Sequence, residues 1–300
     1  MVMELDKILL DEIEKFGQTP KILSLNDKTF DDGGYRTAIT RAVRDLTART
    51  LTPISKGEGS LVEELLSEQE TNSFFNNIKK YFENSELDKD SFDDWHSKRC
   101  KEVLTVINKH YTNQDGSEIC YGKAQKIVNM TLKGCYCLDG ARQKEEYFTY
   151  CHMALDSFTL AWYNRNAQAN RFEKNKTAWS NLTEEKYKNI QTNIRKIELD
   201  IKLFKNLTPL QEEFLIWPLE IMINTVKEVN KCFGGLIDGD FVEEYFETYK
   251  MKNDLRMANT ILGRIQNDSL DPEFIAFLEK IPKNQTGKIK AAEFILEKYN

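Results

Sequence analysis

Long apolar runs are missing from this chain of 300 residues, in which no stretch approaches about eighteen consecutive apolar side chains. A helix that crosses a bilayer needs about that length, so we expect no membrane segment. Residues 1–7 are acidic and amphipathic and lack the apolar core of a signal peptide. These absences together favour a cytoplasmic location.

Histidine is scarce, and the common cofactor motifs are absent. The chain holds three histidines, too few for a histidine-rich metal centre, and it has no phosphate-binding glycine loop, dinucleotide fingerprint or nucleophile elbow. We therefore expect no metal and no cofactor. In a cytosolic protein the six cysteines are expected to be buried thiols instead of disulfides: Cys100, Cys120, Cys135, Cys137, Cys151 and Cys232. The alternative to buried thiols is a zinc site formed by Cys135, Cys137, Cys151 and His152.

Alternating strand patterns are also absent, and apolar residues instead recur at helical spacing. Ser60 and Glu63 form the pattern of a capping box at the start of one helix, whose apolar face is predicted to extend to about residue 82. Further helices are predicted over residues 91–111 and 125–138. The sequence therefore predicts an all-α protein.

The C-terminal half contains a regular apolar seam, which predicts a helix over residues 183–204. Its members are spaced alternately three and four residues apart, as in coiled coils: Tyr187, Ile190, Ile194, Ile197, Ile201 and Phe204. The residues Thr208-Pro209-Leu210-Gln211 then open another helix, so the two helices are expected to fold back as a helical hairpin. We expect domains at 1–165 and 166–300, with helix 187–204 as a possible contact between copies of the chain.

Charge is distributed unevenly around a net value of −6. Residues 58–94 hold eleven acids and three lysines, whereas residues 165–205 hold ten Lys or Arg and five acids. A basic segment of this kind suits a surface that faces phosphates, and Arg165 and Arg171 are its candidates for contact with DNA. The alternative is an ordinary solvated helix surface.

Lys126 and Asp156 are the candidate catalytic residues. Lys126 lies soon after Gly122 in a turn that leads into an apolar helix, and Asp156 precedes a second apolar helix thirty residues later. If the two helices lie side by side, the amine and the carboxylate meet. A lysine is nucleophilic only as the neutral amine, which burial and the positive end of a helix favour. In the structural alternative, Lys126 extends from an amphipathic helix and Asp156 is an N-cap.

Residues 120–165 resemble the helix-hairpin-helix base-excision DNA glycosylases, a family that includes the 8-oxoguanine DNA glycosylases. Gly122 matches the first glycine of the family's hairpin, Lys126 its catalytic lysine, and Asp156 its catalytic aspartate. The pair Gln125-Lys126 and the spacing resemble the archaeal branch most closely. Ala124 stands where the family has a second glycine.

This resemblance implies a helix-hairpin-helix domain that binds duplex DNA and excises a modified base. The base would be flipped into a pocket, Lys126 would attack the sugar, and Asp156 would stabilise the positive charge that develops. Backbone amides of the hairpin would hold a phosphate, with Gly122, Lys123 and Gln125 as contact residues. The alternative is a non-enzymatic helical interaction protein, such as a phage- or prophage-encoded inhibitor that oligomerises and binds a bacterial defence complex.

Overall fold

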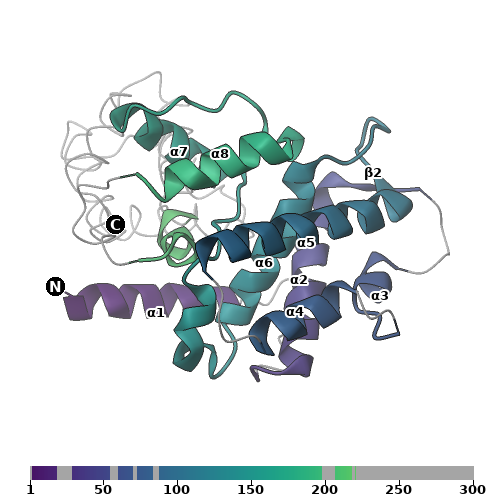
Figure 1. Cartoon of the computed structure of the whole chain (residues 1–300), viewed down its shortest axis with the longest axis horizontal. Helices are drawn as coiled ribbons and strands as arrows, with labels where there is room; N and C mark the ends of the chain where they lie inside the picture. The colour runs from purple at the N-terminus through teal and green to yellow at the C-terminus, as the bar shows by residue number, and fades with distance from the viewer. Residues whose placement is uncertain are drawn as a thin grey trace, which may run out of the picture. The chain divides into compact units, whose positions relative to one another are not determined.

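The computed structural model describes residues 2–18, 29–54, 60–69, 73–83, 88–197, 207–217 and 220. In this part of the chain the regular structure is helical apart from two strands of two residues each, which confirms the all-α prediction (Figure 1). The chain divides into two compact units, Met1–Phe214 and Leu215–Asn300. The first unit extends beyond residue 165, where the sequence placed a domain boundary.

The first unit contains α-helices α1 to α8, two short 3₁₀ helices and one antiparallel strand pair, and residues 209–214 are helical as well. The helices are α1 (Val2–Gln18), α2 (Asp32–Thr50), α3 (Leu61–Leu65), α4 (Phe74–Glu83), α5 (Lys89–His110), α6 (Tyr121–Tyr136), α7 (Ser157–Ala169) and α8 (Glu184–Ile194). The 3₁₀ helices are η1 (Ala141–Phe148) and η2 (Trp179–Asn181), and the strands are β1 (Thr52–Pro53) and β2 (Tyr111–Thr112).

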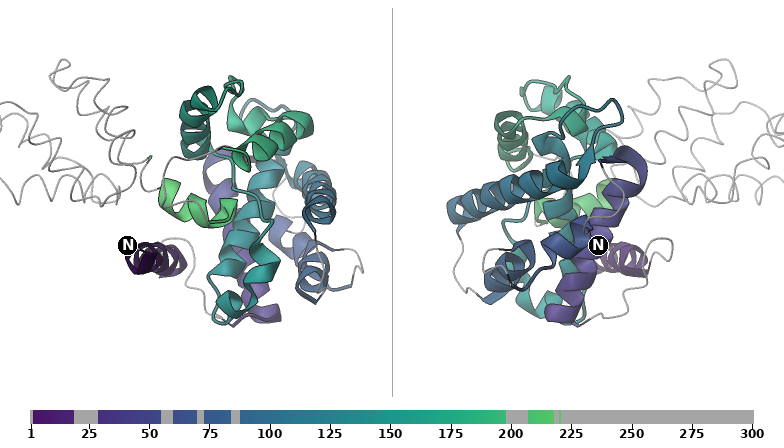
Figure 2. Two further views of the ribbon diagram at one scale, coloured as in Figure 1. Left: turned by 60° about the vertical axis from the view of Figure 1, so that its left-hand side comes forward. Right: turned by 90° about the vertical axis from the view of Figure 1, so that its right-hand side faces the viewer.

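Helix α6 is the centre of this unit, because nearly all of its side chains are buried. Its most extensive contacts are with α2 and then with α5 (Figure 2). The close approach to α2 depends on Gly134, where an added Cβ would lie 3.0 Å from the Cβ of Ala38. A helix buried on most sides must satisfy every polar side chain that it carries, and this requirement determines the polar interior described below.

Two helix predictions need correction in the first half of the chain. The capping box is present, since Ser60 Oγ accepts from Glu63 N and Glu63 Oε2 accepts from Ser60 N, but the helix that it starts ends at Leu65. A separate helix, α4, carries the rest of that apolar face. The helix predicted over 125–138 begins at Tyr121 instead, so the residues after Gly122 are helical and do not form a turn before the helix.

The predicted helix over 183–204 is also shorter than expected, because α8 ends at Ile194. Its last turn tightens where Ile197 N donates to Ile194 O at 3.2 Å. Tyr187, Ile190 and Ile194 are buried inside the chain. The seam residues Ile201 and Phe204 lie outside the described residues, so a contact between copies through 187–204 stays a prediction.

The cap predicted at residue 208 is confirmed: Gln211 N donates to Thr208 Oγ1 at 3.3 Å, and Thr208 N donates to Gln211 Oε1 at 2.9 Å. Residues 198–206 lie outside the described residues, and so does the predicted helical hairpin that they would connect. Among the described helices none has both the length and the apolar character needed to cross a membrane.

The cysteines are mostly buried, as expected. Cys100, Cys135 and Cys151 are buried free thiols, whereas Cys120 is exposed and Cys232 lies outside the described residues. Within the described part of the chain, no group of three or more His, Cys, Asp or Glu side chains is arranged to hold a metal ion.

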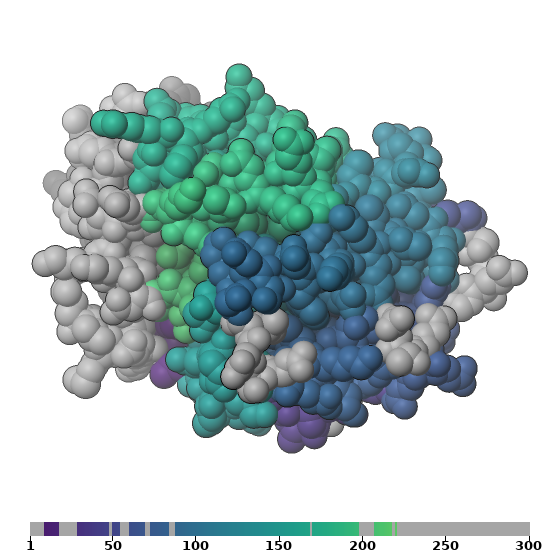
Figure 3. Space-filling model, viewed as in Figure 1, coloured from purple at the N-terminus to yellow at the C-terminus, as the bar shows by residue number. Residues whose placement is uncertain are grey.

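Helices α5 and α8 lie side by side on one face of the unit (Figure 3). Their contact is polar, since Ser97 Oγ donates to Glu184 Oε1 at 2.5 Å and Lys101 Nζ lies 2.9 Å from Glu184 Oε2. These two helices, together with α6, supply most of the buried polar side chains near the candidate site.

Candidate functional site

The structure brings Lys126 and Asp156 together, as the sequence predicted. Lys126 Nζ lies 3.3 Å from Asp156 Oδ2 and 4.0 Å from Asp45 Oδ2, a carboxylate on α2. The Lys126 side chain is 15% exposed and that of Asp156 is 12% exposed, so the pair is close to solvent without being freely hydrated. The amine is therefore held between two carboxylates, near the starts of α6 and α7.

The two carboxylate oxygens of Asp156 contact different groups. Oδ1 caps α7 by accepting from Phe158 N at 2.9 Å and Thr159 N at 3.1 Å, while Thr159 Oγ1 accepts from Asp156 N at 2.8 Å. Oδ2 faces Lys126. The cap fixes the carboxylate at the positive end of α7.

An aromatic ring also lies beside the Lys126 amine. Lys126 Nζ lies 5.1 Å from the centroid of the Trp179 ring, which belongs to η2. A cation at this distance from an indole face is stabilised by the ring quadrupole. The surroundings of Lys126 therefore combine two carboxylates and one aromatic ring. These are contacts suited to an ammonium group, and the environment for a neutral amine that the sequence led us to expect finds no support in them.

Gly122 is placed differently from the sequence expectation. It lies in the first turn of α6, and its N–H donates to Leu182 O at 3.0 Å, so this amide points into the protein and not toward a phosphate. An added Cβ would lie 1.9 Å from Trp179 O. Glycine is therefore needed for a close approach between two backbone segments, and this approach carries Trp179 toward Lys126.

Replacing Gly122 with alanine is expected to destabilise the protein by more than about 2 kcal/mol, because the clash is with backbone. The free energy of unfolding in urea measures this change. Gly17→Ala is the matched control, since an added Cβ there meets only Cys137 Cβ at 3.7 Å on a helix and should stabilise by about 0.5–1 kcal/mol. Equal stability of the Gly122→Ala variant and wild type would contradict the close approach.

The other residues proposed for DNA contact are dispersed. Gln125 is fully buried and Lys123 is 5% exposed, with Lys123 Nζ donating to Thr50 O at 2.8 Å and Asn113 Oδ1 at 2.7 Å. Arg165 is half-buried on α7, and Arg171 is exposed just beyond that helix. A DNA contact through Lys123 or Gln125 therefore finds no support in this arrangement, whereas Arg171 faces solvent.

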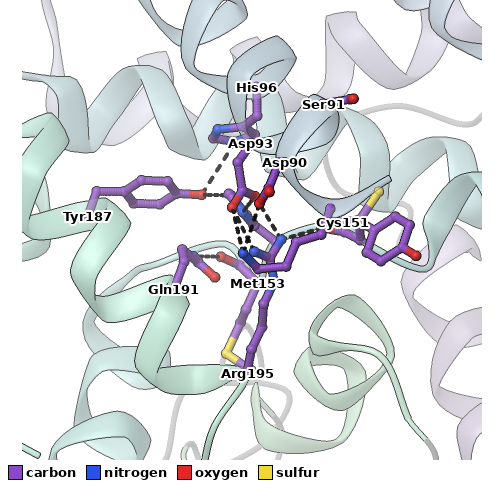
Figure 4. Close-up of polar contacts among 12 residues, drawn as sticks. Asp90, Ser91, Asp93, His96, Cys151, Met153, Tyr187, Gln191 and Arg195 are labelled. Carbon is purple, nitrogen blue, oxygen red and sulfur yellow. Dashed lines mark hydrogen bonds and ion pairs between the residues drawn. The ribbon is translucent and has the colours of Figure 1, made fainter. Parts of the chain in front are cut away.

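Sequence reasoning missed a buried polar network, whose members Asp93, His96, Tyr187 and Arg195 are labelled in Figure 4. His152 Nε2 lies 2.8 Å from Asp93 Oδ1, and His152 Nδ1 lies 2.8 Å from the hydroxyl of Tyr187. The same hydroxyl lies 2.8 Å from Asn129 Nδ2, and Asn129 Oδ1 lies 2.8 Å from His96 Nε2. Side chains of α5, α6 and α8 thus meet around the segment that leads to α7.

The partners determine which atom donates each proton in this network. Asp93 is a carboxylate acceptor, so His152 carries its proton on Nε2 and accepts at Nδ1 from the Tyr187 hydroxyl. Tyr187 oxygen then accepts from Asn129 Nδ2, and Asn129 Oδ1 accepts from His96 Nε2. Each of these four hydrogen bonds has one donor and one acceptor when both histidines are neutral.

Electrostatics support the neutral histidines. Burial lowers the pKa of His152 to about 4, although the Asp93 carboxylate opposes this effect, and burial lowers the pKa of His96 well below its usual value. Burial alone would raise the pKa of Asp93, but hydrogen bonds from His152 and Arg195 bring it well below its ordinary value. Arg195 binds both oxygens of Asp93, each at 2.9 Å.

The fold and the site together define an all-α protein with a pair formed by Lys126, in the second turn of α6, and Asp156, the N-cap of α7, beside a buried polar network. Comparison with models of protein families, with curated proteins and with solved structures found no match for this chain. A functional assignment therefore depends on the chemistry of the described residues.

Proposed function

We propose that this protein binds duplex DNA and excises a modified base, with Lys126 as nucleophile and Asp156 as its electrostatic partner. The contact of 3.3 Å between Lys126 Nζ and Asp156 Oδ2, in a position close to solvent, is the observation that carries the proposal. Nucleophilic catalysis needs a positioned amine and a group that stabilises the charge formed in the transition state. These two side chains supply both.

In the proposed reaction the Lys126 ammonium first gives up a proton to solvent water, and the neutral amine attacks the anomeric carbon of the deoxyribose. The bond between sugar and base breaks, and the base leaves with the electron pair and is protonated. The attached amine then loses a proton to solvent, the bond between the anomeric carbon and the ring oxygen breaks, and the oxygen leaves with the electron pair and is protonated by water. The product is an open-chain sugar held on Lys126 as an iminium Schiff base. In this proposal the Asp156 carboxylate, which contacts Lys126 Nζ, stabilises the positive charge on the sugar and then on the iminium.

Trapping of this Schiff base tests the proposal. Wild type incubated with duplexes that carry an abasic site or an oxidised base, in the presence of borohydride, should form a covalent protein–DNA adduct. Lys126→Gln should form none, because the amide has no nucleophilic amine. Lys186→Gln is the matched control, since the Lys186 amine is exposed and donates to Thr177 Oγ1 at 2.8 Å, and it should form as much adduct as wild type.

A lack of adduct in wild type across the panel of duplexes would reject the proposal. An equal yield from Lys126→Gln would instead assign the chemistry to another amine. Asp156→Asn keeps the cap on α7, because asparagine is as good an N-cap as aspartate. This variant should form the adduct about 10²-fold more slowly, because it lacks the charge that stabilises the transition state.

A second function is favoured by one observation: Lys126 and Asp156 already have a complete structural role. The amine is paired with two carboxylates, and Asp156 caps α7. Under this alternative the protein is a non-enzymatic helical interaction protein that binds a bacterial protein complex, with the acid-rich segment 58–94 as its charged surface. It predicts no trapped adduct with any duplex, and sedimentation should then show an oligomer or a complex with the partner.

A further inference from the structure

The segment between η1 and α7 is buried without regular secondary structure. Residues 151–156 are all buried, so each of their peptide groups needs a hydrogen-bond partner inside the protein. Side chains provide several of these partners: Gln191 Nε2 donates to Met153 O at 2.7 Å, and Ala154 N donates to Glu213 Oε2 at 2.7 Å. Polar side chains from distant parts of the chain therefore determine the path of this segment.

Leu155, the residue before Asp156, is held at two points by one side chain. Leu155 N donates to Gln125 Oε1 at 3.2 Å, and Gln125 Nε2 donates to Leu155 O at 2.8 Å. Gln125 directly precedes Lys126 in the sequence. The side chain of Gln125, the residue before Lys126, is thus bound to the backbone of Leu155, the residue before Asp156.

The orientation of the Gln125 amide is itself fixed. Asn129 Nδ2 donates to Gln125 Oε1 at 2.9 Å, and Gln125 Nε2 also donates to Gly122 O at 2.8 Å. If the Gln125 amide were flipped, its NH₂ group would face two other donors, Asn129 Nδ2 and Leu155 N. Only the observed orientation gives both of these groups an acceptor. Through Asn129 and Tyr187 this amide is connected to the buried His152 and its partner Asp93.

We propose that Gln125 is a positioning residue, whose two-point contact with Leu155 sets the separation between Lys126 and Asp156. The functional consequence of this inference rests on the proposed function, but the geometric claim does not. Helices α6 and α7 share few direct contacts, so their packing alone does not fix the pair. A displacement of about 1 Å at reacting groups can cost on the order of 10²-fold in rate.

Chemical labelling of Lys126 tests the geometric claim without DNA. Reductive methylation with formaldehyde and cyanoborohydride is followed by mass spectrometry, with Lys186 as the reference amine in the same digest. Gln125→Met removes both hydrogen bonds to Leu155 at similar side-chain volume and should raise the labelling rate of Lys126 about fivefold, because the ion pair is loosened. Gln125→Glu keeps an acceptor for Leu155 N and should show a smaller increase.

A double-variant comparison separates positioning from general stability. Asp156→Asn should raise labelling by itself, and Gln125→Met should add nothing in the Asp156→Asn background if Gln125 acts through that carboxylate. Full additivity would overturn the inference, as would wild-type labelling in Gln125→Met. Leu65→Ala, a buried change on α3, should destabilise the protein without altering the labelling of Lys126. All rates are measured below the unfolding temperature of each variant.

Trapping on a duplex with an abasic site then connects the inference to catalysis. At saturating DNA, Gln125→Met should form the adduct about 10²-fold more slowly with an unchanged Kd for the duplex. An unchanged rate would overturn the catalytic role of Gln125. If wild type forms no adduct, the proposed function fails, and the labelling comparison still decides whether Gln125 positions the pair.

Discussion

Replacing Lys133 with methionine is expected to destabilise the protein by about 3–5 kcal/mol, because it leaves the Glu213 carboxylate buried without its counter-ion. Lys133 Nζ lies 2.8 Å from Glu213 Oε1, and the two side chains are 5% and 4% exposed. The amine also lies 4.8 Å from the ring centroid of Phe16 and 4.5 Å from that of Phe214. With an exposed fraction of 4%, the Glu213 carboxylate is largely shielded from solvent.

The free energy of unfolding in urea measures the cost, and a double variant shows its origin. Glu213→Gln retains an acceptor oxygen for Ala154 N, which donates to Glu213 Oε2 at 2.7 Å. Lys133→Met combined with Glu213→Gln removes both charges and should recover most of the stability lost in Lys133→Met alone. A double variant as unstable as the sum of the two single variants would show that the loss comes from packing and not from an unpaired charge.

Local features of the structure could be predicted from the sequence because they depend on neighbouring residues. The capping box at Ser60 and the cap at Thr208 need a hydroxyl and an acid or amide three residues later, and both are present. Lys126 and Asp156 do lie in contact, as the sequence suggested for two neighbouring helices, although the helix that carries Lys126 begins earlier than predicted, at Tyr121. The extent of the helices was less predictable, since α8 ends at Ile194 although its apolar spacing continues.

The supporting polar residues could not be predicted, because their partners are distant in the sequence. Gln125, Asn129 and Lys133 recur every four residues, and this polar stripe on α6 was a visible signal. A stripe of this kind usually faces solvent. Its burial here depends on Glu213, which is 80 residues from Lys133, and on Tyr187, which is 58 residues from Asn129.

Stability is expected to fall by about 3 kcal/mol or more as the pH is lowered from 7 to 4, because of the buried histidines. Burial lowers the pKa of His152 to about 4 and that of His96 well below its usual value. An unfolded histidine has a pKa of about 6.5. Between these limits the unfolded state binds more protons than the folded state, so lowering the pH favours unfolding.

Asp93 adds a separate effect at lower pH. Although burial opposes it, the hydrogen bonds from His152 and Arg195 hold the pKa of Asp93 well below its ordinary value of about 3.9. A carboxyl with a depressed pKa stabilises the fold above its unfolded pKa, and this contribution is lost as the pH falls below about 4. His152 therefore acts between about pH 6.5 and 4, and Asp93 acts below that range.

The pH dependence of unfolding in His152→Gln isolates the contribution of this one residue. Urea unfolding of wild type and variant between pH 7 and 4 should give curves that converge toward low pH, because the variant has no imidazole to protonate at this position. Parallel curves would contradict the assignment of this pH dependence to His152.

The hydrogen-bond network explains why protonation of His152 is unfavourable. Protonated His152 carries a hydrogen on Nδ1, which then faces the hydroxyl hydrogen of Tyr187. Tyr187 must turn its hydroxyl away, and the hydrogen that Asn129 Nδ2 donates to the same oxygen leaves it little room to do so. Acid is therefore expected to break the network at Tyr187 first, two hydrogen bonds away from Gln125.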